Sequence, residues 1–100
     1  MDRREVIELV SNFKKEASLK FSPKEVYLFG SYAKGTATKD SDIDVAFVYD
    51  KYEGNIIKDM SELFRISYNI DYRIEPIIVD NMSDLTGFLS EIKNTGIIIR

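Results

Sequence analysis

Residues 30–45 read GSYAKGTATKDSDIDV, a glycine–serine pair and a polar stretch that end in two aspartates, Asp42 and Asp44. The apolar run VYLFG precedes this stretch at residues 26–30, and DIDVAFVY at residues 42–49 alternates as a strand does. Side chains two residues apart on a strand project to the same face, with Cα atoms about 7 Å apart. Such carboxylates repel, and burying one without a partner is costly. We therefore expect a positively charged ligand between them.

The glycine–serine pair suits a phosphate group. Gly30 has no Cβ to hold a phosphate away from the backbone. Ser31 can donate its hydroxyl and its backbone N–H, and a helical turn that starts there directs its positive end at the anion. Asp42 and Asp44 can then bind one divalent ion or bridge two ions about 3.5–4 Å apart. Magnesium takes few protein carboxylates and completes its shell with phosphates and water, so the pattern predicts a site for Mg²⁺ and a nucleoside triphosphate.

Histidine and cysteine are both absent from the sequence. This excludes zinc sites built on imidazole or thiolate, histidine-dependent triads and cysteine nucleophiles. Any metal must have oxygen ligands, which favours magnesium, manganese or calcium. Disulfides are excluded too, so a cytoplasmic location is expected.

The composition is that of an ordinary soluble domain. The 100 residues, 44% hydrophobic and 31% charged, suffice for a single domain over residues 1–100. The net charge of −3 argues against direct nucleic-acid binding, which usually requires a basic surface. No apolar run approaches the roughly 20 residues that span a bilayer, and the start MDRREVIELV is not a signal peptide. No membrane partner is expected.

Apolar residues at helical spacing predict helices from Asp2 to about Leu19 and from about Ile56 to Tyr68. A last helix should have Ser83 as its N-cap and end at residues 94–96. The stripes expected in the core are Val6, Leu9, Val10, Phe13 and Ala17 in the first helix, Ile56, Met60, Leu63, Phe64 and Ser67 in the second, and Leu85, Phe88, Leu89 and Ile92 in the last.

A third strand is predicted over NIDYRIEPIIVD, residues 69–80, where Pro76 indicates an edge position or a bulge. GIIIR, residues 96–100, is a possible short closing strand. In the second strand Ile43, Val45, Phe47 and Tyr49 should face one side, and Asp42, Asp44, Ala46 and Val48 the other. The order α-β-β-α-β-α predicts an α/β or α+β fold, a small mixed β-sheet flanked by helices.

Two other motifs do not fit residues 30–45. Gly30 and Gly35 have the spacing of a P-loop, but Thr36-Ala37 follows where that motif requires Lys-Ser or Lys-Thr. DSDID at residues 40–44 could open a calcium loop, yet the sixth position is Val45 rather than glycine.

GSYAKGTATKDSDIDV resembles the signature of the nucleotidyltransferase superfamily related to DNA polymerase β. The likeness is strongest to its smallest members, the minimal nucleotidyltransferases paired with HEPN-domain proteins in prokaryotes, and the order of elements extends it over nearly the whole chain. The resemblance implies that Asp42 and Asp44 bind catalytic metal. The residues it implies for the triphosphate are Gly30, Ser31, Lys34 and Ser41. The family often has arginine at the position of Lys34, and a lysine meets a phosphate without the bidentate fork.

The family also uses a third carboxylate from a later strand. Asp71, Arg73 and Glu75 should share one face of the third strand, so either acid could reach the metals. We favour Glu75, because RIEPIIV at residues 73–79 resembles the family's strand.

These features predict a Mg²⁺-dependent nucleotidyltransferase with two metal ions, moving a nucleoside monophosphate from NTP to a hydroxyl. The chain is too short for a large acceptor domain, so a separate protein should supply the acceptor, in a homo- or hetero-oligomer. The resemblance implies a HEPN toxin that accepts AMP from ATP on a tyrosine, with this chain as its antitoxin. The alternatives are a binding antitoxin or regulatory subunit with weak or lost catalysis, and a small-molecule nucleotidyltransferase of the aminoglycoside type.

Overall fold

The computed structural model describes residues 1–84 and 86–100. The helices are α1 (Arg3–Ala17), α2 (Ser31–Lys34), α3 (Ile56–Ile70) and α4 (Phe88–Thr95), with a 3-10 turn η1 (Asn81–Ser83) before α4. The strands β1 (Glu25–Phe29), β2 (Ile43–Tyr49), β3 (Ile74–Asp80) and β4 (Ile97–Ile98) form one sheet in the order β3-β2-β1-β4. β1 is antiparallel to β2 and β4, and β3 is parallel to β2. The predicted mixed sheet flanked by helices is confirmed.

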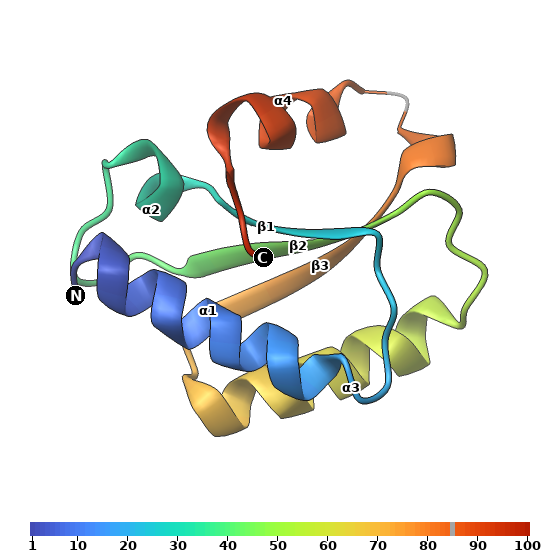
Figure 1. Ribbon diagram of the computed structural model, residues 1–100, viewed down its shortest axis with the longest axis horizontal. Coiled ribbons are helices and arrows are strands. Elements are labelled where there is room, and N and C mark those ends of the chain that lie inside the picture. Colours follow the sequence, from blue (N-terminus) through green and yellow to red (C-terminus); the bar gives the residue numbers. More distant parts are fainter. Residues whose placement is uncertain (85) are drawn as a thin grey trace.

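The sheet lies between two layers of helix. Figure 1 shows α1 and α3 beneath one face and α4 above the other. The larger core lies on the α1 and α3 side, and its buried residues include Val6, Val10, Phe13, Ile43, Val45, Phe47 and Leu63. A smaller cluster on the α4 side includes Tyr27, Ala46, Val48, Leu89 and Ile92. The predicted alternation of β2 is therefore confirmed.

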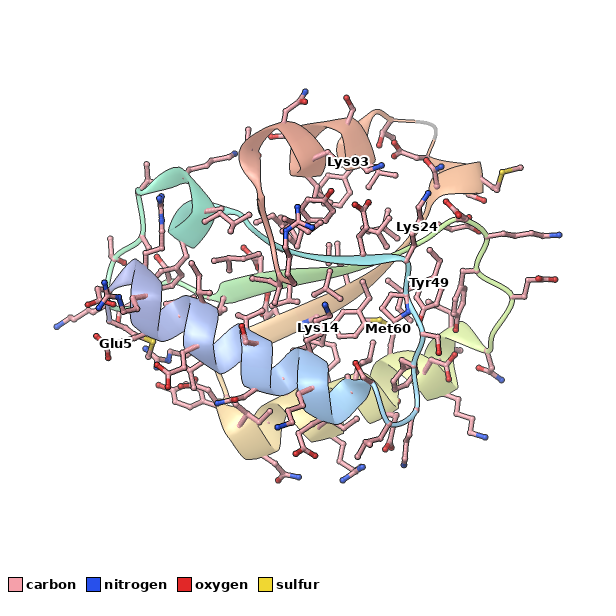
Figure 2. All side chains as sticks on the ribbon, in the orientation of Figure 1. Glu5, Lys14, Lys24, Tyr49, Met60 and Lys93 are labelled. Atoms are coloured by element: carbon pink, nitrogen blue, oxygen red, sulfur yellow. The ribbon has the colours of Figure 1, made fainter. Side chains whose placement is uncertain are left out.

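A lysine side chain ties α1 to the end of the sheet. Figure 2 shows Lys14 of α1 and Lys93 of α4 on opposite sides of it. Lys14 Nζ donates to the carbonyl of Ile99, 2.8 Å away, and so holds the segment after β4 against α1.

Among the described helices, none is long and apolar enough to cross a membrane.

The helices α1 and α3 begin close to where the spacing of apolar residues predicts. Asp2 caps α1 through a capping box with Glu5, and Asn55 caps α3 by accepting from the Lys58 N–H. The predicted apolar stripe of α3 is only partly right. Leu63 and Ser67 are buried, but Ile56 and Phe64 are 48% and 44% exposed. The buried face of α3 contains Ile66, which the predicted stripe did not include.

The predicted start of the third strand at residue 69 is wrong. α3 continues to Ile70, Asp71 is its C-cap, and β3 begins only at Ile74. The Asp71 carboxylate accepts a hydrogen bond from the Arg73 N–H, which turns the chain before the strand begins. Asp71, Arg73 and Glu75 therefore do not share the face of one strand. Pro76 lies in β3 at the edge of the sheet, as predicted.

The predicted N-cap of the last helix is also wrong. Ser83 belongs to η1, whose own cap is Asp80, and α4 begins after Gly87, which has a φ of 77°. The expected position of Leu85 on the apolar stripe lies outside the described residues. Leu89 and Ile92 are buried as predicted, whereas Phe88 remains 39% exposed. The closing strand is present as β4.

Candidate active site

The C-terminal end of β1 and the N-terminal ends of β2 and β3 meet at one end of the sheet, next to α2 (Figure 1). There Asp44 of β2 pairs with Phe29 of β1 on one side and with Glu75 of β3 on the other. Alternation along β2 puts Asp44 on the same face as Ala46, which packs in the α4 layer. Asp44 and Glu75 are thus neighbours across two strands on the α4 side.

Asp44 lies in an unfavourable environment for a charge. Burial, and then the neighbouring carboxylates of Glu75 and Asp42, raise the pKa of Asp44 from 3.8 to about 6. Asp44 is half-buried, while Asp42 and Glu75 are exposed. The three carboxylates are therefore near enough to repel, as expected for a site that binds a cation.

Gly30 brings its backbone directly against this cluster. Its φ and ψ of 74° and −152° lie in a region that is essentially restricted to glycine. A Cβ on Gly30 would overlap the Oδ2 atom of Asp44. The sequence therefore needs glycine at this position both for the backbone angle and for the close approach to Asp44.

Two side chains position α2 and the loop that follows it. Arg3 Nη2 donates to the Ala33 carbonyl, 2.9 Å away, at the end of α2. The Tyr32 hydroxyl donates to the Thr38 carbonyl at 3.4 Å. Arg3 stands 30 residues before Ala33 in the chain, and no local pattern in the sequence indicated this contact.

Lys34 and Ser41 both have partners within the protein. Lys34 Nζ lies 3.5 Å from Glu91 Oε1, so this ammonium is directed towards α4. Ser41 Oγ accepts from the Thr38 N–H at 2.8 Å and thereby closes the loop before Asp42. A triphosphate would have to compete with Glu91 for Lys34 and with Thr38 for Ser41.

Asp71, the alternative third carboxylate, is engaged elsewhere. Its Oδ2 accepts from Arg73 Nη2 at 2.7 Å, and the two side chains are only 15% and 21% exposed. These hydrogen bonds from Arg73 lower the pKa of Asp71. The Arg73 carbonyl accepts from the Ile43 N–H at 2.8 Å, so the residue that binds Asp71 also joins the start of β3 to β2 through its backbone. Sequence reasoning missed this structural role.

The donor set has the chemistry of a magnesium site. Within residues 1–84 and 86–100, no three acidic side chains are arranged to hold a metal ion by themselves. Magnesium does not require this, because it is usually bound by one or two carboxylates together with substrate phosphates and water. Asp44, with Asp42 and Glu75 beside it and the Gly30 backbone in contact, fits that requirement.

A family model, the nucleotidyltransferase domain, matches residues 10–99, and the chain belongs to this family. The predicted minimal nucleotidyltransferase, an enzyme that transfers nucleotidyl groups, is thereby confirmed. The chain is 38% identical to "Putative protein adenylyltransferase MJ0141" of Methanocaldococcus jannaschii, over 93% of this chain and 97% of that protein.

Solved structures share the fold. A "putative nucleotidyltransferase" from Sulfolobus solfataricus is similar with a TM-score of 0.65 and 27% identity, over 96% of this chain and 80% of that one. A toxin-antitoxin crystal structure with AMP-PNP is similar with a TM-score of 0.59 and 22% identity, over 94% of this chain and 72% of that one. At this identity the second likeness concerns the fold alone.

Proposed function

We propose that this chain transfers AMP from ATP to a hydroxyl of a partner protein in a Mg²⁺-dependent reaction. The observation that carries the proposal is the meeting of Gly30, Asp44 and Glu75 at one end of the sheet. The relative named as a protein adenylyltransferase, which is similar over nearly the whole chain, supports a protein acceptor. We further propose that the partner is a HEPN-domain toxin and that this chain is its antitoxin.

In this proposal the carboxylates hold the metal and the glycine–serine turn holds the phosphates. Asp42, Asp44 and Glu75 bind magnesium, which when bound neutralises charge on the triphosphate and favours ionisation of the acceptor hydroxyl. The backbone of Gly30 and the hydroxyl of Ser31 bind the β- and γ-phosphates. Lys34 joins them after it leaves Glu91, and Ser41 after it leaves Thr38.

The chemical step forms one bond and breaks one. The acceptor oxygen attacks the α-phosphorus, and the bond from this phosphorus to the bridging oxygen breaks. Pyrophosphate leaves with the electron pair, and Glu75 takes the hydroxyl proton and passes it to water. Glu75 is exposed on the edge strand β3, so a hydroxyl of another protein can approach it from outside the sheet.

The test is a transfer assay with labelled ATP, Mg²⁺ and the product of the gene that neighbours the gene for this chain. We expect the label on the partner, and we expect Glu75→Gln to slow transfer at least about 100-fold while the fold and the complex persist. Asp71→Asn is the matched control, because it also removes one carboxylate near β3 but should leave transfer largely intact.

Two outcomes would contradict the proposal. Efficient transfer to a free small molecule by this chain alone would favour the aminoglycoside-type activity. Unchanged neutralisation of the partner in cells by the Glu75→Gln variant would show that binding, and not adenylylation, is the working function.

A further inference from the structure

An aromatic pair lies beside the metal-binding carboxylates. Phe29 is the residue of β1 that pairs with Asp44, and it lies on the α4 side of the sheet. Phe88, the first residue of α4, contacts Phe29 edge to face, with ring centroids 5.8 Å apart. Although it takes part in this contact, Phe88 remains 39% exposed. Part of its ring is therefore open to a ligand.

A cavity of about 170 Å³ connects this pair with the proposed phosphate site. Its lining includes Phe29, Gly30, Lys34, Phe88, Glu91 and Ile92. One wall is apolar and aromatic, and the other carries the Lys34–Glu91 ion pair. The backbone of Gly30 belongs both to this cavity and to the contact with Asp44. A ligand whose phosphates lie at Gly30 can thus extend one end into the cavity.

The charges of the cavity indicate which end of a nucleotide it fits. Glu91 is a carboxylate, which repels phosphates but accepts hydrogen bonds from hydroxyl and amino groups. A nucleoside offers both kinds of donor and a flat ring that stacks on aromatic side chains. The Lys34 ammonium attracts phosphates, so Lys34 would leave Glu91 and bind them.

We propose that Phe88 and Glu91 bind the nucleoside part of the substrate, with the base against the Phe88 ring. Glu91 accepts a hydrogen bond from a sugar hydroxyl or from an amino group of the base. The inference rests on the proposed function, because it takes the phosphates to lie at Gly30 and Asp44. It adds a nucleoside subsite formed by α4, a helix that the sequence motif does not include.

Calorimetry with two ligands tests this subsite. Mg²⁺-ATP carries the nucleoside, and Mg²⁺-tripolyphosphate carries only the phosphate chain. We expect Phe88→Ala to weaken ATP binding roughly tenfold, the size of one lost base stack, and to leave tripolyphosphate binding unchanged. Phe88→Tyr should retain the affinity for ATP. Phe64→Ala is the matched control, since Phe64 is 44% exposed but lies on α3, across the sheet.

Glu91 gives a sharper signature. Glu91→Ala removes an acceptor for the nucleoside, but it also frees Lys34 and removes a repulsive charge. The gain at the phosphates applies to both ligands, so we expect the affinity for ATP relative to tripolyphosphate to fall in this variant. A side chain that only stabilises α4 would change both affinities by the same factor.

Two results would overturn the inference. One is an unchanged affinity of Phe88→Ala for ATP. The other is an equal loss of affinity for ATP and for tripolyphosphate in Phe88→Ala, with a circular dichroism spectrum that shows a native fold. If the unmodified chain binds neither ligand, the phosphate site itself is absent, and the proposed function falls together with the subsite. Binding of tripolyphosphate with no preference for ATP would reject the nucleoside subsite alone.

Discussion

Asp44 should destabilise the metal-free protein, and removing its charge should make the fold more stable. Burial and the neighbouring carboxylates raise its pKa from 3.8 to about 6. At about 1.36 kcal/mol per pKa unit, this rise corresponds to about 3 kcal/mol against the ionised form. Asp44 is only half-buried, so solvent screening reduces the expected gain for Asp44→Asn to about 1–1.5 kcal/mol.

The effect has a defined dependence on pH. Because the folded-state pKa of Asp44 lies above its value in the unfolded chain, folding favours the protonated form. Its favourable contribution is complete below pH 3.8 and is lost as the pH rises through about 6. The wild-type chain should therefore gain stability relative to Asp44→Asn as the pH falls from 7 to 4, and the two should converge in acid.

Urea and thermal unfolding in the presence of EDTA measure this difference. At pH 8 we expect the midpoint temperature of Asp44→Asn to be about 5–10 °C higher than that of the wild type. With Mg²⁺-ATP at about 100 times its dissociation constant, the wild type should gain about 2.7 kcal/mol and the variant almost nothing. A variant that is no more stable than the wild type at pH 8 without metal would refute the assigned electrostatic strain.

Three further substitutions separate structural residues from binding residues. Asp71→Asn should lower the free energy of unfolding in urea at pH 7 by about 1–3 kcal/mol, since Arg73 loses its charged partner. Because the pKa of Asp71 is lowered in the folded chain, this stabilisation should fade as the pH falls, and an equal loss at pH 3 would contradict the assignment. Gly30→Ala should lower the free energy of unfolding by about 1–3 kcal/mol and abolish the binding of Mg²⁺-ATP in calorimetry, because the Cβ of the alanine would overlap Asp44. Normal binding by this variant would place the phosphates elsewhere. Lys34→Gln should change stability by less than about 1 kcal/mol but weaken binding of Mg²⁺-tripolyphosphate and flatten its salt dependence, and undiminished binding would remove Lys34 from the phosphate site.

The parts of the fold and the site that follow from short-range patterns could be predicted from the sequence. Alternation in residues 42–49 placed Asp44 on the face opposite Ile43, and the structure has this arrangement. Gly30 was expected to let the backbone approach a phosphate, and this stays a prediction; in the structure the missing Cβ lets the backbone lie against Asp44. Both inferences depend only on strand parity and on the missing Cβ of glycine.

Long-range contacts decided what the sequence could not predict. NIDYRIEP alternates like a strand, yet its first residues belong to α3, because Asp71 can close the turn after this helix with Arg73. A side chain that bonds to nearby backbone competes with regular structure, and periodicity does not register that competition. The Arg3–Ala33 contact and the packing of Phe88 on Phe29 join segments far apart in the chain. Composition and spacing therefore gave no sign of them.

The Asp71–Arg73 pair and the Asp44–Glu75 pair are linked by the register of β3. Arg73 uses its side chain to bind Asp71 and its carbonyl to accept from the Ile43 N–H, which fixes where β3 starts beside β2. In that register Glu75 lies next to Asp44. Two repelling carboxylates would move apart if the strand were free to shift, but a shift would break the hydrogen bond from the Ile43 N–H to the Arg73 carbonyl. The fold thus holds the like charges together before any cation is bound, and relief of that repulsion would favour binding of the proposed magnesium ion and its nucleotide.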